Sequence, residues 1–231
     1  MYEHDSDHGR REKEVYDHFR RVKSSLTGSI LVRHALDDFQ VTSGDNSHSY
    51  QCLVHPPLAM SLFELRNRAA GKVLPENLLK PTLIHILLAL DFLHTDAQVI
   101  HTGKIPPMLL ALSLLSALYA DLRSDIQEKN IMLGVEDESI LVDFEEAEKS
   151  NPSPRKITGD RVIYSSRNLG IPKVHGRPIL SDFGEARFIS RIGTQWEDVQ
   201  PLIYRAPEVL LRLPWNEKID IWNLGVLVCI P

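Results

Sequence analysis

The sequence has little cysteine and no glycine-rich loop, and each of these absences excludes a class of protein. Only two of the 231 residues are cysteines, so a disulfide framework is not expected and a reducing compartment is favoured. No two of the 12 glycines lie two positions apart, which excludes a Gly-x-Gly-x-x-Gly phosphate-binding loop within this sequence. His-Glu-x-x-His, Gly-x-Ser-x-Gly and zinc-type cysteine spacings are absent as well, which argues against zinc hydrolases and serine hydrolases.

The sequence also lacks the usual signs of secretion, membrane insertion or nucleic-acid binding. Its first 14 residues are charged and have no apolar core, so we do not expect a signal peptide. A nearly apolar run covers residues 108–120, but a bilayer requires roughly 20 apolar residues. The net charge of −5 gives no indication of nucleic-acid binding. The apolar fraction of 43% and the charged fraction of 25% are ordinary for a globular protein.

Apolar periodicity and turn residues predict a mixture of helices and strands. The helix expected over residues 75–94 has a broad apolar face made by Leu78, Leu79, Ile84, Leu87, Leu88 and Phe92. Residues 151–178 are polar and contain prolines, so we expect them at the surface. The other expected helices cover residues 9–24 and 217–229, and short strands are expected over residues 29–33, 50–55, 131–133 and 139–142.

Three short motifs near the end of the sequence follow one another in a characteristic order. Asp182-Phe183-Gly184 comes first, Ala206-Pro207-Glu208 second, and the pattern Asp-x-Trp-x-x-Gly starts at Asp220. The first two motifs bracket the activation segment of eukaryotic protein kinases, and Glu208 lies 26 positions after Asp182, which leaves room for one ordered loop. The third motif resembles the start of the central helix of the kinase large lobe. The sequence therefore resembles a serine/threonine protein kinase.

A kinase catalytic loop needs an Asp that orients the substrate hydroxyl and an Asn five positions later that binds Mg²⁺. Asp125 satisfies this spacing, because residue 130 is Asn. Asp96 does not, because residue 101 is His, which is a poor ligand for a hard cation. In the family, a His-x-Asp motif opens the loop, and His101 is the residue that would supply its histidine.

Residues 103–124 separate His101-Thr102 from Asp125. Joining residue 102 to residue 125 gives Val-Ile-His-Thr-Asp-Ile-Gln-Glu-Lys-Asn-Ile-Met-Leu, which closely resembles kinases related to the SR-protein kinases, especially their fungal relatives. The resemblance covers residues 9–228 apart from this insertion. The insertion is either a surface helix or translated non-coding sequence such as a retained intron, and the restored register favours the second interpretation. Gln127 stands where most kinases have a phosphate-contacting Lys.

Two Asp residues are candidates for the second metal ligand. Asp143, in Asp-Phe-Glu, lies 13 positions after Asn130, about where most kinases have this ligand. Asp182 lies much later but precedes Phe-Gly, and glycine lets the backbone turn after the phenylalanine. The SR-protein-kinase-like group carries an insertion between these elements, which the resemblance assigns to residues 144–177. We therefore expect Asp182 to bind the metal, with Asp143 as the alternative.

The resemblance implies an α+β, protein-kinase-like fold that is incomplete. Residues 1–58 would form a partial small lobe with the regulatory helix, the last strands and the hinge. Residues 59–231 would form a partial, mainly α-helical large lobe that is truncated after its central helix. The strand that carries the phosphate-holding lysine is not found before the first helix. Glu12, or alternatively Glu14, corresponds to the glutamate that pairs with this lysine, and we expect either to be a solvated helix charge.

The function implied by the resemblance is ATP-dependent phosphorylation of Ser or Thr in protein substrates, which are Arg/Ser-rich for related kinases. No nucleic-acid or membrane partner is expected, and an intracellular location in the cytoplasm, the nucleus or both is implied. Activity of this chain is expected to be impaired; the alternative is a catalytically dead remnant that acts as a binding module, or a non-functional gene product. The resemblance implies that Asp125 is the catalytic base and that His101 and Asn130 belong to the same catalytic loop. Asn130 and Asp182 would be the ligands of Mg²⁺. Pro56 and Leu58 would contact the adenine.

Overall fold

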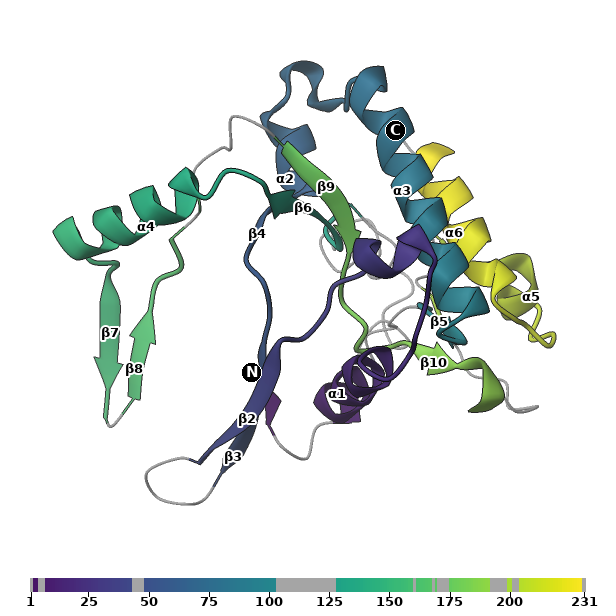
Figure 1. Cartoon of the computed structure of the whole chain (residues 1–231), viewed down its shortest axis with the longest axis horizontal. Coiled ribbons are helices and arrows are strands. Elements are labelled where there is room, and N and C mark those ends of the chain that lie inside the picture. The colour runs from purple at the N-terminus through teal and green to yellow at the C-terminus, as the bar shows by residue number, and fades with distance from the viewer. Residues whose placement is uncertain are drawn as a thin grey trace, which may run out of the picture.

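The structure is a computed structural model, and it describes residues 2–3, 7–42, 48–102, 128–159, 161–167, 169, 175–191, 199–200 and 204–229. It combines helices with small antiparallel sheets (Figure 1), which agrees with the expected α+β class. The helices are α1 (Asp7–Phe19), η1 (Thr27–Leu31), α2 (Leu62–Arg68), η2 (Ala70–Lys72), α3 (Glu76–Thr95), α4 (Ser139–Ser150), η5 (Ile189–Arg191), α5 (Pro207–Leu210) and α6 (Lys218–Cys229), where η denotes a 3₁₀ helix.

Within the described residues, the strands pair in small sheets with the orders β1-β3-β2, β4-β6-β9, β10-β5 and β7-β8. In the sheet that matters most for the site, Ile131 of β6 lies opposite Leu180 of β9. An isolated bridge joins Val32 to Leu180, so the segment after η1 also lies beside β9. The strands are β1 (Tyr2–Glu3), β2 (Asp37–Thr42), β3 (Ser49–Val54), β4 (Leu58–Ser61), β5 (Val99–Ile100), β6 (Ile131–Val135), β7 (Arg155–Thr158), β8 (Arg161–Tyr164), β9 (His175–Leu180) and β10 (Arg187–Phe188).

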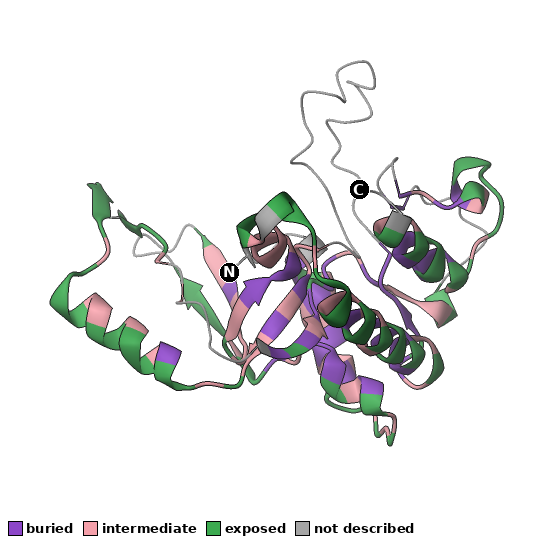
Figure 2. Ribbon diagram, turned by 90° about the horizontal axis from the view of Figure 1, so that it is seen from above, coloured by how far each residue is buried: buried purple, intermediate pink, exposed green. Residues whose placement is uncertain are grey.

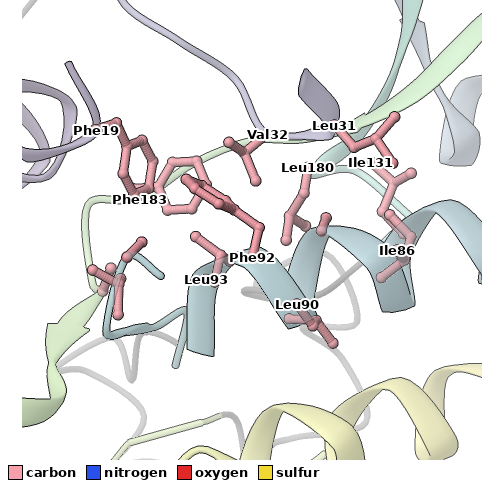
Figure 3. Packing of buried hydrophobic residues seen from close by; sticks show 14 of the residues in the cluster. Phe19, Leu31, Val32, Ile86, Leu90, Phe92, Leu93, Ile131, Leu180 and Phe183 are labelled. Carbon is pink, nitrogen blue, oxygen red and sulfur yellow. The ribbon is translucent and has the colours of Figure 1, made fainter. Parts of the chain in front are cut away.

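The larger apolar core is formed by buried residues of α1, η1, α3, β6 and β9. Three phenylalanines meet in it (Figure 3): the ring centroids of Phe19 and Phe92 are 5.8 Å apart, and those of Phe19 and Phe183 are 5.1 Å apart. Buried residues are concentrated in this central region, whereas α4 and its neighbouring hairpin are mostly exposed (Figure 2). A second, smaller core is made by Ile100, Val199, Ala206, Val209 and Ile219.

Helix α3 confirms the helix expected over residues 75–94, but the expected apolar face was wrong in part. Ile84, Leu87 and Leu88 are 58%, 48% and 36% exposed. The residues of α3 that are almost completely buried are instead Ile86, Ala89, Leu90, Phe92 and Leu93. α3 is long and apolar enough to cross a membrane by length and composition alone, but burial of one face within the protein is also what a core helix shows.

Contact between η1 and α3 is close enough to require glycine. A Cβ atom at Gly28 would lie 1.8 Å from the carbonyl oxygen of Leu88 and 2.9 Å from Cβ of Phe92. The two backbones therefore touch at this position, and this contact fixes which face of α3 is buried.

Two of the expected strands are helical in the structure. Residues 139–142 begin α4, and most of residues 29–33 belong to η1. A short apolar run does not distinguish a strand from a buried helix segment. In α4 the run continues into Glu, Ala and Lys, which favour helix, and the ion pair between Lys149 and Glu145, at 2.6 Å, follows the helical i,i+4 spacing.

Most of α4, all of β7 and β8, and the start of β9 fall within residues 144–177. The α4 helix and the β7–β8 hairpin extend to one side of the core in Figure 1. Large apolar side chains of the hairpin are solvent-facing, since Ile157, Ile163 and Tyr164 are each more than half exposed. The proposed division into a small lobe at residues 1–58 and a large lobe at residues 59–231 stays a prediction.

Candidate functional site

Asn130 and Asp182 lie at the ends of two neighbouring strands. Asn130 immediately precedes β6, and Asp182 lies two residues after the end of β9. The backbone N–H and the hydroxyl of Ser181 both donate to the carbonyl oxygen of Asn130, each at 2.9 Å. The β6–β9 pairing therefore brings together two residues that are 52 positions apart in the sequence.

Asp182 has an exposed side chain on a constrained backbone. Its φ angle is 68°, in the left-handed region that Asp tolerates better than most residues. Phe183 beside it is completely buried, whereas Asp182 faces solvent. Among the residues that the structure describes, the carboxylate accepts one long hydrogen bond, 3.4 Å, from the N–H of Gly184. Its oxygens are thus available to a cation.

Helix α2 holds the residues that precede Asn130. Arg66 of α2 forms an ion pair with Glu128 at 2.7 Å, and the N–H of Phe63 donates to the carbonyl oxygen of Glu128 at 3.1 Å. The ammonium of Lys129 lies 4.8 Å from the centroid of the Phe63 ring, a cation–π contact. These contacts fix the approach to β6.

A buried carboxylate on α6 fixes the backbone of His101 and Thr102. Asp220 is fully buried, and its two oxygens accept the N–H of His101 at 2.8 Å and the N–H of Thr102 at 3.0 Å. His94 Nε2 lies 2.9 Å from Oδ2 of Asp220, the oxygen that also accepts the N–H of His101. The ring therefore donates in the tautomer that has its proton on Nε2. The sequence motif located Asp220 but gave it no role, because the residues that it holds are more than 100 positions away.

The ring of His101 is buried, with 1% of the residue exposed. Its Nε2 donates to the carbonyl oxygen of Ser181 at 3.2 Å, and the ring packs edge-to-face on Phe183 with centroids 5.1 Å apart. The catalytic-loop role expected of His101 stays a prediction, and the ring is buried in the structure. It connects the loop to the segment that carries Asp182.

Helix α1 contacts the segment after Phe183. Arg11 forms an ion pair with Glu185 at 2.8 Å and also donates to the carbonyl oxygen of Gly184. Farther along, Arg191 pairs with Glu14 at 2.7 Å and lowers the pKa of that carboxyl. The helix and the segment that follows Asp182 are therefore joined by charge as well as by apolar packing.

Glu12 corrects the expectation of a solvated helix charge. Only 6% of Glu12 is exposed, and its Oε1 accepts the hydroxyl of Tyr16 at 3.3 Å. Burial raises the pKa of Tyr16 well above its ordinary value, and the carboxylate of Glu12 raises it further. Glu14, the alternative, is the surface residue of the two.

Comparison with known proteins finds serine/threonine protein kinases similar to this chain. A serine/threonine protein kinase of Aspergillus fumigatus is 38% identical to this chain over 222 residues, which cover 94% of the chain and 46% of the relative. The serine/threonine-protein kinase SRPK of Physarum polycephalum is 33% identical over 198 residues, 84% of the chain and 43% of the relative.

The chain belongs to the serine/threonine protein kinase family. A more distant member, homeodomain-interacting protein kinase 1 of Caenorhabditis elegans, is 28% identical over 183 residues, which cover 79% of the chain and 15% of the relative. No family model matches the chain. The chain spans just under half the length of the Aspergillus and Physarum kinases, and its similarity to SRPK agrees with an SR-protein-kinase-like member of the family.

Several residues that the kinase resemblance singled out lie outside the described residues. These are Asp125, Gln127 and the insertion at residues 103–124. The role of Asp125 therefore stays a prediction, supported by its spacing from Asn130.

The expected hinge joins β3 to β4 of this kinase-family chain. Pro56 and Leu58 are half-buried, and Leu58 lies opposite Gly134 of β6. His55, one residue earlier, packs on Tyr16 of α1 with ring centroids 4.9 Å apart. Burial lowers the pKa of His55 more than the hydrogen bond with the carbonyl oxygen of His34 raises it. The adenine contacts assigned to Pro56 and Leu58 stay a prediction.

Asp143, the alternative metal ligand, is exposed on α4. The Asp-Phe-Glu motif there continues a helix and does not follow a strand that pairs with β6. This position favours Asp182, which follows β9, as the partner of Asn130.

Proposed function

We propose that this chain contributes to the ATP-dependent transfer of a phosphoryl group to Ser or Thr hydroxyls of protein substrates. The observation that carries the proposal is the juxtaposition of Asn130 and Asp182 at the paired ends of β6 and β9. In this proposal Asp125 accepts or orients the hydroxyl proton of the substrate, and Asn130 and Asp182 hold the metal. Pro56 and Leu58 would contact the adenine through their backbone groups.

The residues at the strand ends fit Mg²⁺. An amide oxygen and a carboxylate oxygen are hard ligands, and Mg²⁺ commonly takes one or two protein ligands together with phosphate oxygens and water. The exposed carboxylate of Asp182, which accepts one long hydrogen bond, suits this use. When bound, the metal would neutralise negative charge on the phosphates.

Positioning is the main contribution that the described residues make. Phosphoryl transfer depends chiefly on alignment and charge stabilisation, and Asp220 holds the loop backbone at His101 and Thr102 through two charge-assisted hydrogen bonds. His101 connects this loop to the carbonyl of Ser181. The proposed reaction therefore uses Asp220 and His101 to hold the loop in register with Asp182.

The finer parts of the proposal concern the substrate and the level of activity. We propose Arg/Ser-rich substrates, no nucleic-acid or membrane partner, and an intracellular location in the cytoplasm or the nucleus. Residues 103–124 lower activity in this proposal, because they separate His101 from Asp125, and a displacement of about 1 Å can reduce the rate roughly 100-fold.

The test compares single substitutions in the chain. Asp182→Ala should abolish Mg²⁺-dependent ATP binding, whereas Asp143→Ala should leave it unchanged within about twofold; the reverse pattern would overturn the choice of metal ligand. In a longer chain that lacks residues 103–124 and carries a full small lobe and a complete large lobe, transfer from labelled ATP to a Ser/Arg-rich peptide should disappear with Asp125→Asn. Equal transfer by this variant and its parent would refute the assignment of the base, and nucleotide binding without any transfer would favour a non-catalytic binding module.

A further inference from the structure

The segment between α4 and β7 contains a short motif that the proposed function does not use. The motif is Ser153-Pro154-Arg155-Lys156, and nowhere else in the 231 residues does Ser or Thr precede proline. Prolines flank the serine on both sides, and a residue that precedes proline is biased toward extended backbone. The motif therefore combines a hydroxyl in an extended stretch with a proline directly after it and two cations beyond.

The motif lies where another protein can reach it. Its neighbours at positions 151, 152 and 154–156 are all exposed, and Ser153 itself is half-buried. Helix α4 and the β7–β8 hairpin, which this segment joins, extend to one side of the core in Figure 1 and are mostly exposed in Figure 2. A second protein can therefore approach the serine without displacing the core.

The carboxylate of Glu148, in the last turn of α4, holds the serine in place. Oγ of Ser153 donates to Oε2 of Glu148 at 2.8 Å, and the backbone N–H of Ser153 donates to Oε1 of the same side chain at 2.6 Å. Nε of Arg167 also donates to Oε2 of Glu148, at 2.7 Å. Glu148 thus joins the end of α4 to the motif and to Arg167.

Arg167 lies within reach of a phosphate group on Ser153. Oγ of Ser153 and Nε of Arg167 bind the same oxygen, at 2.8 and 2.7 Å, so the two atoms are no farther apart than the sum of these distances, about 5.5 Å. The guanidinium also donates to the carbonyl oxygen of Asn151, two residues before Ser153. A phosphate adds three acceptor oxygens beyond Oγ, and a guanidinium fork matches two of them.

We propose that Ser153 is a phosphorylation site for a separate, proline-directed protein kinase, and that its phosphate takes Arg167 away from Glu148. In the transfer, Oγ of Ser153 bonds to the terminal phosphorus of ATP, the bond from that phosphorus to the bridging oxygen breaks, and ADP leaves. The hydroxyl proton passes to the base of the modifying kinase. Proline has no N–H, so a kinase that leaves this backbone position without an acceptor prefers it, and acidic groups on that kinase select Arg155 and Lys156.

The phosphate replaces one electrostatic contact with another. A phosphoserine carries a charge of about −1.5 to −2 at pH 7, and Oγ no longer has a proton to donate to Glu148. Repulsion releases the carboxylate of Glu148, and the guanidinium of Arg167 turns to the phosphate. An anion near the C-terminus of a helix is also unfavourable, and Ser153 lies three residues after Ser150, where α4 ends. Phosphorylation therefore loosens the connection between α4 and the hairpin.

The first experiment incubates the purified chain with a cyclin-dependent kinase and labelled ATP, and subtracts a blank without added kinase. Wild type should take up phosphate, and tandem mass spectrometry should locate it at Ser153. Pro154→Ala should lower the initial rate at least tenfold, whereas Ser150→Ala, which removes an exposed serine that precedes Asn, should change it less than twofold. Glu148→Ala should raise the rate at least threefold, because the hydroxyl loses its acceptor.

Three results would overturn the inference. The first is phosphate uptake that is unchanged in Ser153→Ala. The second is phosphorylation of a peptide of residues 148–159 but not of the folded chain, because the hydroxyl would then be inaccessible in the native protein. The third is a lack of phosphorylation in both the peptide and the chain. None of these results depends on phosphoryl transfer by this chain, so the proposed function is tested separately.

Phosphorus NMR of the phosphorylated chain tests the role of Arg167. Contact with a guanidinium favours the dianion, so the second pKa of the phosphate, ordinarily about 6, should be lower in wild type than in Arg167→Gln by about half a pH unit or more. Arg68→Gln, which removes an exposed arginine of α2, should titrate like wild type. Equal titration of wild type and Arg167→Gln would refute the transfer of Arg167 to the phosphate.

Discussion

Replacing Asp220 by Asn tests whether a single buried carboxylate organises the catalytic loop. The substitution keeps the shape of the side chain and changes one oxygen to an NH₂ group. At present the carboxylate accepts the N–H groups of His101 and Thr102 at 2.8 and 3.0 Å and faces His94 Nε2 at 2.9 Å. Whichever way the amide is turned, at least one donor meets another donor.

The magnitude follows from the number of bonds lost in a site without solvent. A hydrogen bond to a charged group contributes about 1.5–3 kcal/mol, and a buried donor left without an acceptor costs about 1–3 kcal/mol more. Asp220→Asn should therefore lower the free energy of unfolding by about 3–5 kcal/mol, which is a large share of the roughly 5–15 kcal/mol of an ordinary domain.

The assay is urea unfolding followed by far-UV circular dichroism at pH 7. The matched control is Asp91→Asn on α3, where an exposed carboxylate accepts one bond from Thr95 at 3.3 Å, and it should change the free energy of unfolding by less than about 0.5 kcal/mol. If Asp220→Asn is as stable as this control, with an unchanged urea dependence, then Asp220 does not hold the loop in the way described.

Two further predictions concern packing and pH. Gly28→Ala should destabilise the chain by about 3 kcal/mol, since the new Cβ would lie 1.8 Å from a backbone oxygen. Gly225→Ala in α6, where no atom lies within 4 Å of the new Cβ, should stabilise it by about 0.5–1 kcal/mol. Thermal unfolding of both variants checks the pair, and equal effects would refute the contact between η1 and α3. Burial lowers the pKa of His55, so the contribution of this residue to stability is complete above the unfolded pKa of about 6.5 and is lost as the pH falls through the folded pKa. The urea midpoint of wild type should therefore drop more below pH 6.5 than the midpoint of His55→Gln. Parallel curves for the two proteins would contradict this environment for the ring.

The long helices and the family were predictable from local signals. The apolar pattern of residues 75–94 predicted α3, and the Asp-Phe-Gly, Ala-Pro-Glu and Asp-x-Trp-x-x-Gly motifs predicted the kinase family that the comparisons support. Such signals depend on neighbours in the sequence, which is why one sequence suffices to read them.

Short segments and burial were less predictable. Residues 139–142 have an apolar pattern that fits a strand, but they begin α4, because the helix-forming residues after them decide the conformation. Glu12 has the sequence surroundings of a solvated charge, but it is buried. Its burial results from packing with Tyr16 and from neighbours on segments that are distant in the sequence.

The sequence by itself determined the spacing of Asp125 and Asn130, the order of the motifs and the positions of the main helices. Only the tertiary structure decided that the segments of Asn130 and Asp182 meet, that Asp220 holds His101, and that Glu12 is buried beside Tyr16. The first two are contacts between segments that are separated by many residues. Pairing of β6 with β9 and packing of α6 behind the loop create them, and no local pattern of side chains encodes such distances.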